Sequence, residues 1–127
     1  MKKKFDDKTP IYIQIADAIE DDILTGELKE GDKCYSQLQL SKELDINPAT
    51  AAKGIRLLVD RGVLNKVRGQ AMTVKKNAAD KIRRRRMDQG LNEKLEALVQ
   101  EAKKLGVSKD ILVVKMVQMY HKLQSEE

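Results

Sequence analysis

The chain has 127 residues, of which 25 are lysine or arginine and 20 are aspartate or glutamate, so its formal net charge is +5. This length accommodates one compact domain with a short appendage. Aromatic residues make up only 3% of the chain, so the hydrophobic core must be aliphatic. The chain contains no run of 18 apolar residues, and its basic first residues lead into acids. We therefore expect neither a membrane-spanning helix nor a signal peptide. The single cysteine, Cys34, cannot form an internal disulfide, which fits a cytoplasmic protein.

The charges are unevenly distributed along the chain. Residues 17–32 contain seven acids and one base, whereas residues 47–76 contain seven bases and one acid. A chain folded from these two stretches would have an acidic side and a basic side, and only the basic side could approach phosphate groups. We expect the acids of residues 17–32 to form an outward face that repels DNA and orients docking.

The first half of the chain predicts three helices. Thr9 as N-cap and Pro10 as the first helical residue begin the first helix, and Gly26 ends it. Residues 36–39 (SQLQ) form a capping box that starts a second, short helix. Residues 47–48 (NP) repeat the cap-then-proline pattern and start a third helix, with residues 45–47 as the turn between the two. This spacing is typical of a helix-turn-helix.

The second half predicts a hairpin followed by a helical tail. Residues 63–67 and 72–75 read as two strands, joined by a turn that contains Gly69. The residues from Asn77 are expected to form a helix that ends at Gly106, and a last helix follows. The expected fold class is therefore mainly α with a small β-hairpin. A winged helix-turn-helix DNA-binding domain would cover residues 9–76, and a two-helix dimerisation region would cover residues 77–125.

Four segments resemble the GntR family of transcription regulators: residues 10–15 (PIYIQI), 23–33 (ILTGELKEGDK), 46–53 (INPATAAK) and 61–64 (RGVL). The resemblance covers about residues 9–76 and implies a winged helix that binds DNA. Proteins of this family usually carry a large effector or aminotransferase-like domain after the winged helix, and this tail is too short for either. The short two-helix tail is similar to that of the YtrA subfamily, whose members are dimeric repressors.

Two positions depart from the usual pattern of that family. The family usually has an arginine that contacts DNA where this chain has Leu38, and a second wing glycine where it has Ala71. Both departures leave the expected fold unchanged, but they alter the expected set of DNA contacts.

The DNA-contacting residues are predicted from the exposed face of the third helix and from the hairpin. Lys53 can donate to guanine O6 or N7 in the major groove, and Arg68 beside Gly69 suits a minor-groove or backbone contact. The alternatives are solvated helix charges for Lys53 and Arg56, and an ordinary hairpin turn at residues 68–71. The predicted contact residues are Ser36, Gln37, Asn47, Pro48, Ala49, Thr50, Lys53, Arg56, Lys66, Arg68, Gly69 and Gln70.

The last helix is apolar nearly all round, so one neighbouring helix cannot cover it, and a second subunit would. The alternative is a single face packed on the DNA-binding domain, with no contact between subunits. The predicted dimerisation residues are Leu91, Leu95, Leu98, Ile111, Leu112, Met116, Met119, Tyr120 and Leu123. The basic run at Lys81 and residues 83–86 has three interpretations: a solvated helix start, contacts with flanking phosphates, or pairing with acids of a partner chain.

The sequence thus predicts a sequence-specific transcriptional repressor that binds an inverted-repeat operator as a homodimer. The alternative is a protein-interaction adaptor that uses the apolar last helix to dock a partner. We recognise no catalytic constellation, and Cys34 and His121 lie in different modules. We therefore predict no enzyme, no metal and no cofactor. The expected partners are double-stranded DNA and a second copy of the chain, with no membrane; the sequence leaves room for a small-molecule effector but identifies none.

Overall fold

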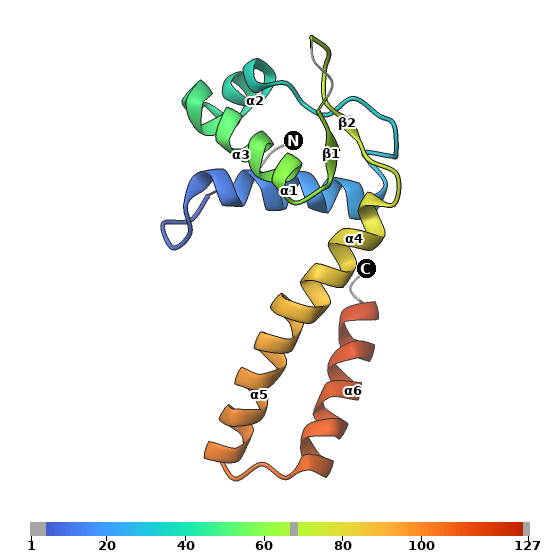
Figure 1. Ribbon diagram of the computed structural model, residues 1–127. Helices are drawn as coiled ribbons and strands as arrows, with labels where there is room; N and C mark the ends of the chain where they lie inside the picture. The colour runs from blue at the N-terminus through green and yellow to red at the C-terminus, as the bar shows by residue number, and fades with distance from the viewer. Residues whose placement is uncertain (1–4, 67–68, 126–127) are drawn as a thin grey trace. The chain divides into compact units, whose positions relative to one another are not determined.

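The computed structural model describes residues 5–66 and 69–125 of the chain, drawn in Figure 1. These residues divide into two compact units, an N-terminal unit that ends at Arg85 and a C-terminal unit that begins at Arg86. No helix among the described residues is long and apolar enough to cross a lipid bilayer.

The first helix, α1, spans Ile11–Thr25. It begins one residue later than predicted, because Pro10 is the N-cap residue with extended backbone (φ −51°, ψ 139°) and no side chain caps the helix. The carbonyl of Thr9 instead accepts a hydrogen bond of 2.6 Å from the Gln14 side-chain amide. Gly26 ends α1 as predicted, in the left-handed region at φ 87°, where glycine carries no steric penalty.

The helix-turn-helix forms at the positions predicted from the capping residues Ser36 and Asn47. Helix α2 spans Gln37–Leu44 and α3 spans Pro48–Asp60. The hydroxyl of Ser36 accepts a hydrogen bond from the Gln39 backbone N–H at 3.0 Å. The Asn47 side chain accepts one from the Ala49 backbone N–H at 2.8 Å. Each cap satisfies a backbone donor that the first turn of a helix leaves without an intrahelical partner.

The described strands of the hairpin are shorter than predicted, and Val67, the last residue of the predicted first strand, lies outside the described residues. Strand β1 spans Leu64–Asn65 and pairs antiparallel with β2, Thr73–Val74, with Leu64 opposite Val74. The segment before α2 adds a further partner to β2: the Cys34 N–H donates to the Met72 carbonyl (2.8 Å), and a bridge joins Lys33 to Thr73. The hairpin is therefore held against the body of the unit as well as by its own strand pair.

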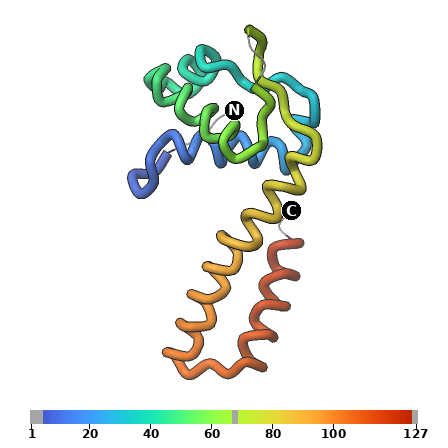
Figure 2. The backbone as a smooth tube through the Cα atoms, in the orientation of Figure 1, coloured from blue at the N-terminus to red at the C-terminus, as the bar shows by residue number. Residues whose placement is uncertain are grey.

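The aliphatic core of the N-terminal unit lies where α1, α2, α3 and the hairpin meet, and Figure 2 follows the chain around it. Its largest fully buried apolar side chains are Ile15, Ile19, Leu40, Leu58, Val63, Leu64, Val74 and Ile82. Gly54 lets α1 and α3 approach closely, because a Cβ at this position would lie 3.1 Å from the Tyr12 carbonyl oxygen. Helix α4, Ala78–Arg85, buries Ile82 in the same core and so belongs to this unit. The proposed division of function at residues 76 and 77 stays a prediction.

The C-terminal unit consists of helical segments joined by one turn. A π-helical segment, η1 (Arg86–Leu91), precedes α5 (Asn92–Lys104), and α6 covers Lys109–Ser125. The helix expected from Asn77 to Gly106 is thus interrupted by a change of hydrogen-bond pattern at η1. Gly106, at φ 72°, forms the turn into α6.

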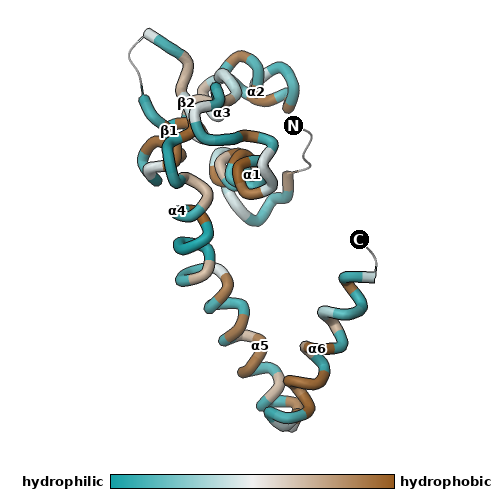
Figure 3. The backbone as a smooth tube through the Cα atoms, turned by 90° about the vertical axis from the view of Figure 1, so that its right-hand side faces the viewer, coloured by the Kyte–Doolittle hydropathy of each residue, from teal (hydrophilic) through white to brown (hydrophobic). Residues whose placement is uncertain are grey.

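The apolar side chains of this unit are largely uncovered. Of its described residues only Ala102 is buried, and Figure 3 shows hydrophobic residues along both α5 and α6. The predicted dimerisation residue Leu112 is half-buried. The other eight are exposed: Leu91, Leu95, Leu98, Ile111, Met116, Met119, Tyr120 and Leu123.

Candidate nucleic-acid interface

A groove of about 530 Å³ lies between α3 and the hairpin. Its walls come from the segment that leads into α2, from one side of α3 and from the hairpin, all of which lie above α1 in the view of Figure 1. The structure brings five of the predicted DNA-contacting residues to this groove: Ser36, Gln37, Arg56, Lys66 and Gln70. Arg56 and Lys66 place a cation on each of two walls, and Asp60 adds one carboxylate to the lining. The two cations outnumber this carboxylate, which suits a bound anion such as a phosphate group.

The first turn of α3 presents a second set of predicted contact residues. Asn47, Pro48 and Ala49 are exposed and Thr50 is half-buried. The side chains here are small, and the positive end of the helix dipole lies at this turn. The Ala49 N–H is already bound by the Asn47 side chain and the Thr50 N–H by the Asn47 carbonyl. A helix end of this kind can approach a DNA backbone or the edges of bases closely.

Lys53, the residue predicted to contact bases, lies next to α1. Its ammonium nitrogen is 4.2 Å from the centroid of the Tyr12 ring, which is a cation–π contact. The side chain nevertheless stays exposed. Tyr12 was not predicted to lie near Lys53, because a contact between α1 and α3 produces no pattern in the sequence around either residue.

The hairpin turn is described only in part. Gly69 takes φ 74°, and Gln70 beside it is exposed. Arg68, the predicted minor-groove contact, lies outside the described residues. A glycine in the left-handed conformation makes this reversal tight.

Two side chains that line the groove, Tyr35 and Cys34, have pKa values above their ordinary ones. The Tyr35 hydroxyl donates a 2.7 Å hydrogen bond to the Asp22 carboxylate, and burial, followed by this carboxylate, raises the pKa of Tyr35 above its usual range. Burial also raises the pKa of the Cys34 thiol from 9.0 to about 11. Both residues line the groove, and at neutral pH neither adds a negative charge there.

The first turn of α2 carries Leu38, which is 61% exposed. The side chain therefore points outward at the position where the GntR pattern usually has a DNA-contacting arginine. A leucine there offers apolar contact but no charge to a phosphate group.

The acidic stretch does not form the uniform outward face that we expected. Glu20 is fully buried, and its carboxylate pairs with Arg61 (3.3 Å) and with Arg85. Asp17 pairs with Arg61 at 2.9 Å. The buried carboxylate neutralises arginines inside its own chain, so it is not available to repel DNA.

The basic run also separates into residues with different surroundings. Arg85 pairs with Glu20, and Arg83 pairs with Asp80 within α4 at 2.9 Å. Lys81 and Arg84 line a hollow of about 620 Å³ whose other cationic residues are Lys75 and Lys76. Arg85 is therefore not part of a solvated helix start, which was one of the three interpretations of this run.

The arrangement of a helix-turn-helix, an antiparallel hairpin and a groove between them defines a winged-helix protein. Residues 11–74 match the family model described as bacterial regulatory proteins, gntR family. The chain belongs to the GntR family, as the resemblance implied.

Similar proteins extend this likeness through the tail. The uncharacterized HTH-type transcriptional regulator YhcF of Bacillus subtilis is 31% identical over 112 residues, which cover 87% of this chain and 89% of that protein. The HTH-type transcriptional repressor YtrA of the same organism is 31% identical over 99 residues, 78% of this chain and 75% of the relative. A GntR family transcriptional regulator from Listeria monocytogenes superposes with a TM-score of 0.70 at 30% identity, over 90% of this chain and 98% of the other. The expected likeness to YtrA is confirmed.

Proposed function

We propose that this chain is a transcriptional repressor that binds an inverted-repeat operator in double-stranded DNA as a homodimer. The observation that carries the proposal is the groove between α3 and the hairpin, which gathers Arg56 and Lys66 beside the exposed first turn of α3. The name of the relative YtrA, a repressor, favours repression over activation.

Two kinds of DNA contact follow from this geometry. The groove would receive the sugar–phosphate backbone between Arg56 and Lys66, since cations on two walls match a line of phosphate groups. The first turn of α3, with Ala49 at its surface, would then enter the major groove and contact base edges and thymine methyl groups. Backbone contacts would supply most of the affinity, and the contacts of α3 would supply the sequence preference.

The C-terminal unit is proposed to join two copies of the chain. Among its described residues, fourteen large apolar side chains are exposed. A unit of about 40 residues rarely supports a core of its own. One end of α6 lines an apolar groove of about 500 Å³ with Met116, Met119, Tyr120 and Leu123. We take the partner to be a second copy of the chain, because its α6 carries the same apolar surface. A twofold axis between the copies would place their two α3 helices on the two halves of an inverted repeat.

The proposal is tested by selecting bound sequences from random duplex DNA with the purified full-length chain. We expect an inverted repeat to be enriched. Its binding, measured by fluorescence anisotropy, should weaken as salt rises, with a slope of log K against log [salt] of about −0.9 for each phosphate neutralised. If no sequence is enriched and the binding is indifferent to salt, the proposal is wrong. Salt-independent capture of a partner protein would support the adaptor instead.

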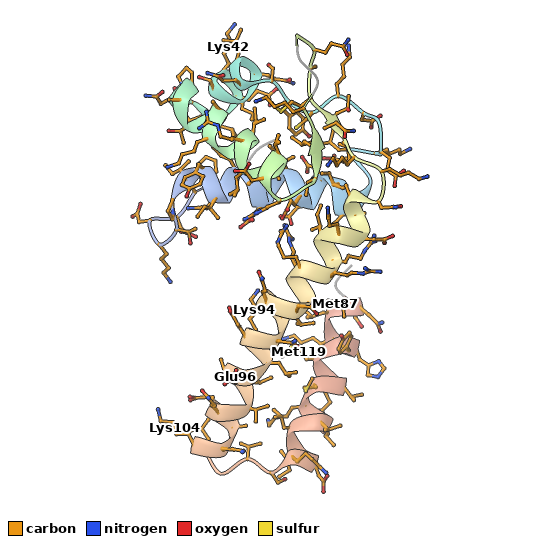
Figure 4. All side chains as sticks on the ribbon, in the orientation of Figure 1. Lys42, Met87, Lys94, Glu96, Lys104 and Met119 are labelled. Atoms are coloured by element: carbon orange, nitrogen blue, oxygen red, sulfur yellow. The ribbon has the colours of Figure 1, made fainter. Side chains whose placement is uncertain are left out.

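A matched pair of double variants separates the groove from general surface charge. Arg56→Ala with Lys66→Ala removes the two groove cations, and we expect the slope to become shallower by about 2 × 0.9. Lys94→Ala with Lys104→Ala removes two cations that project from α5 (Figure 4), and we expect the slope to stay within error of the wild type. Equal changes in both double variants would contradict the assignment of the groove.

A further inference from the structure

Among the described residues of the N-terminal unit, the carboxylate of Glu20 on α1 is the one that is fully buried. Its Oε1 atom lies 3.3 Å from Nη1 of Arg61 and also accepts a hydrogen bond from Nη2 of Arg85. The two arginine side chains are themselves mostly covered, at 19% and 26% exposed. Glu20 is thus a shared anchor for two cations that come from different parts of the chain.

Arg61 and Arg85 lie at the ends of two helices, α3 and α4, that have different roles in the proposed function. Arg61 is the C-cap residue of α3, the helix proposed to enter the major groove. Arg85 is the last residue of α4, which leads out of the N-terminal unit. Through Glu20, the end of the DNA-contacting helix and the end of the outgoing helix are held by the same carboxylate oxygen.

Stability alone is a weak reason for this cluster. Removing a carboxylate from water is costly, and a buried ion pair often adds no net stability over apolar residues that fill the same volume. The best-attested use of a buried ion pair is to select one packing geometry among several. Apolar packing tolerates shifts of a helix along or about its axis more readily than an ion pair does, because the ion pair requires its atoms to stay at hydrogen-bond distance.

The helix changes character directly after Arg85. Residues 86–91 form the π-helical segment η1 before α5 begins. π-helical turns are frequent at functional sites and mark places where a helix departs from regular geometry. Arg85, which contacts Glu20, is the last residue of α4. The chain after Arg85 belongs to the C-terminal unit.

We propose that Glu20 is a positioning residue that fixes the direction of α4 relative to α3, and so sets the spacing between operator half-sites that a dimer accepts. This inference rests on the proposed function. The direction in which α4 leaves the N-terminal unit fixes where the chain toward the second copy starts. Each base pair inserted between half-sites moves one of them by about 3.4 Å along the DNA and by about a tenth of a turn around it, so a rigidly held α4 makes the spacing selective.

The experiment compares full-length variants on a set of duplexes that carry the selected operator. The set includes the operator itself, versions with one or two base pairs added or removed between the half-sites, and a duplex with a single half-site. The wild type is expected to lose on the order of tenfold or more in affinity for a spacing changed by one base pair, because simultaneous engagement of both half-sites fails.

Arg85→Gln removes the anchor of α4 and leaves Glu20 paired with Arg61. We expect this variant to keep the half-site affinity of the wild type within about twofold and to lose less than about threefold on a changed spacing. The reason is that the end of α4 beyond buried Ile82 is no longer held to Glu20, which restores simultaneous engagement. Arg83→Gln is the matched control, since Arg83 lies on the same helix and pairs only with Asp80 among the described residues. It should keep the wild-type spacing profile. Arg85→Lys, which retains the charge, should recover part of the selectivity.

Glu20→Gln is expected to broaden the spacing profile as Arg85→Gln does, and thermal unfolding followed by circular dichroism verifies that each variant is folded. If Glu20→Gln does not fold, the two Arg85 variants decide the question. A folded Arg85→Gln protein with the wild-type spacing profile would overturn the inference, and so would equal broadening by Arg83→Gln. A wild type that binds no DNA would overturn the proposed function itself. A wild type with a sharp spacing preference that Arg85→Gln retains would overturn only the role of Glu20.

Discussion

The ammonium nitrogen of Lys53, the only lysine of α3, lies 4.2 Å from the centroid of the Tyr12 ring on α1. This contact joins the helix that we propose to enter the major groove to the helix that packs against it. It also gives Lys53 two different roles to be separated, a contact with DNA and a contact that stabilises the free protein.

For Lys53→Ala we expect the affinity for the selected operator to fall by about 5–150-fold at fixed salt, which corresponds to the loss of one good base contact of about 1–3 kcal/mol. Fluorescence anisotropy measures the change. Tyr12→Phe keeps the aromatic ring and should leave the affinity close to that of the wild type. An unchanged affinity in Lys53→Ala, together with a lower free energy of unfolding, would mean that Lys53 serves only the contact with Tyr12.

The helix caps predict a defined loss of stability. Ser36→Ala and Asn47→Ala each remove the side-chain acceptor for a backbone N–H of a first helical turn. We expect the free energy of unfolding to fall by about 0.5–2 kcal/mol in each variant, measured by urea denaturation. The matched control is Ser125→Ala, because Ser125 donates a hydrogen bond to the His121 carbonyl at an exposed helix end and caps no first turn. A loss as large in the control would show that the caps are not the cause.

The apolar surface of α6 predicts the effect of a single added charge on assembly. Met119 is half exposed and lines the apolar groove on that helix. We expect Met119→Glu to shift the protein from dimer to monomer in sedimentation velocity at micromolar concentration, because a carboxylate buried between subunits would lose its hydration. Lys94→Glu also adds negative charge, on a side chain that projects from α5 (Figure 4), and should leave the dimer intact. A monomeric wild type would refute the proposed role of the C-terminal unit.

Burial of Cys34 predicts slow alkylation. Because burial raises the pKa of its thiol from 9.0 to about 11, the thiolate fraction at pH 8 should be about a hundredfold lower in the folded chain than in the unfolded chain. The rate of iodoacetamide modification, followed by mass spectrometry with and without urea, measures this difference. The sign for stability follows as well: the raised pKa contributes stability that is fully present below pH 9 and is lost as the pH rises through about 11. Equal alkylation rates in the two states would contradict it.

Much of the winged helix could be predicted from the sequence, because its signals act within one turn of chain. The cap of α3 joins Asn47 to Ala49, two residues away, and Gly26 needs no partner to adopt φ 87°. Such local interactions depend only on residues that are close together in the sequence. Helical periodicity likewise separates exposed Arg56 from buried Ile55 and Leu58, so the outward face of α3 could be read from the sequence. That this face contacts DNA stays a prediction.

Other features depend on residues that are distant in the sequence. Glu20 belongs to a run of acids that looks like a solvated face, yet it is fully buried, because an arginine 65 positions later pairs with it. Gly54 looks like a weak point of α3 and is instead where α1 comes within contact distance. Whether a charge is buried, and how closely two helices approach, depends on which faces of different helices pack together. Composition and periodicity describe the faces of a single helix and do not say which other helix packs on them. The amino-acid pattern therefore establishes the winged helix, whereas the placement of Glu20 among Arg61 and Arg85 follows from the packing of α1, α3 and α4.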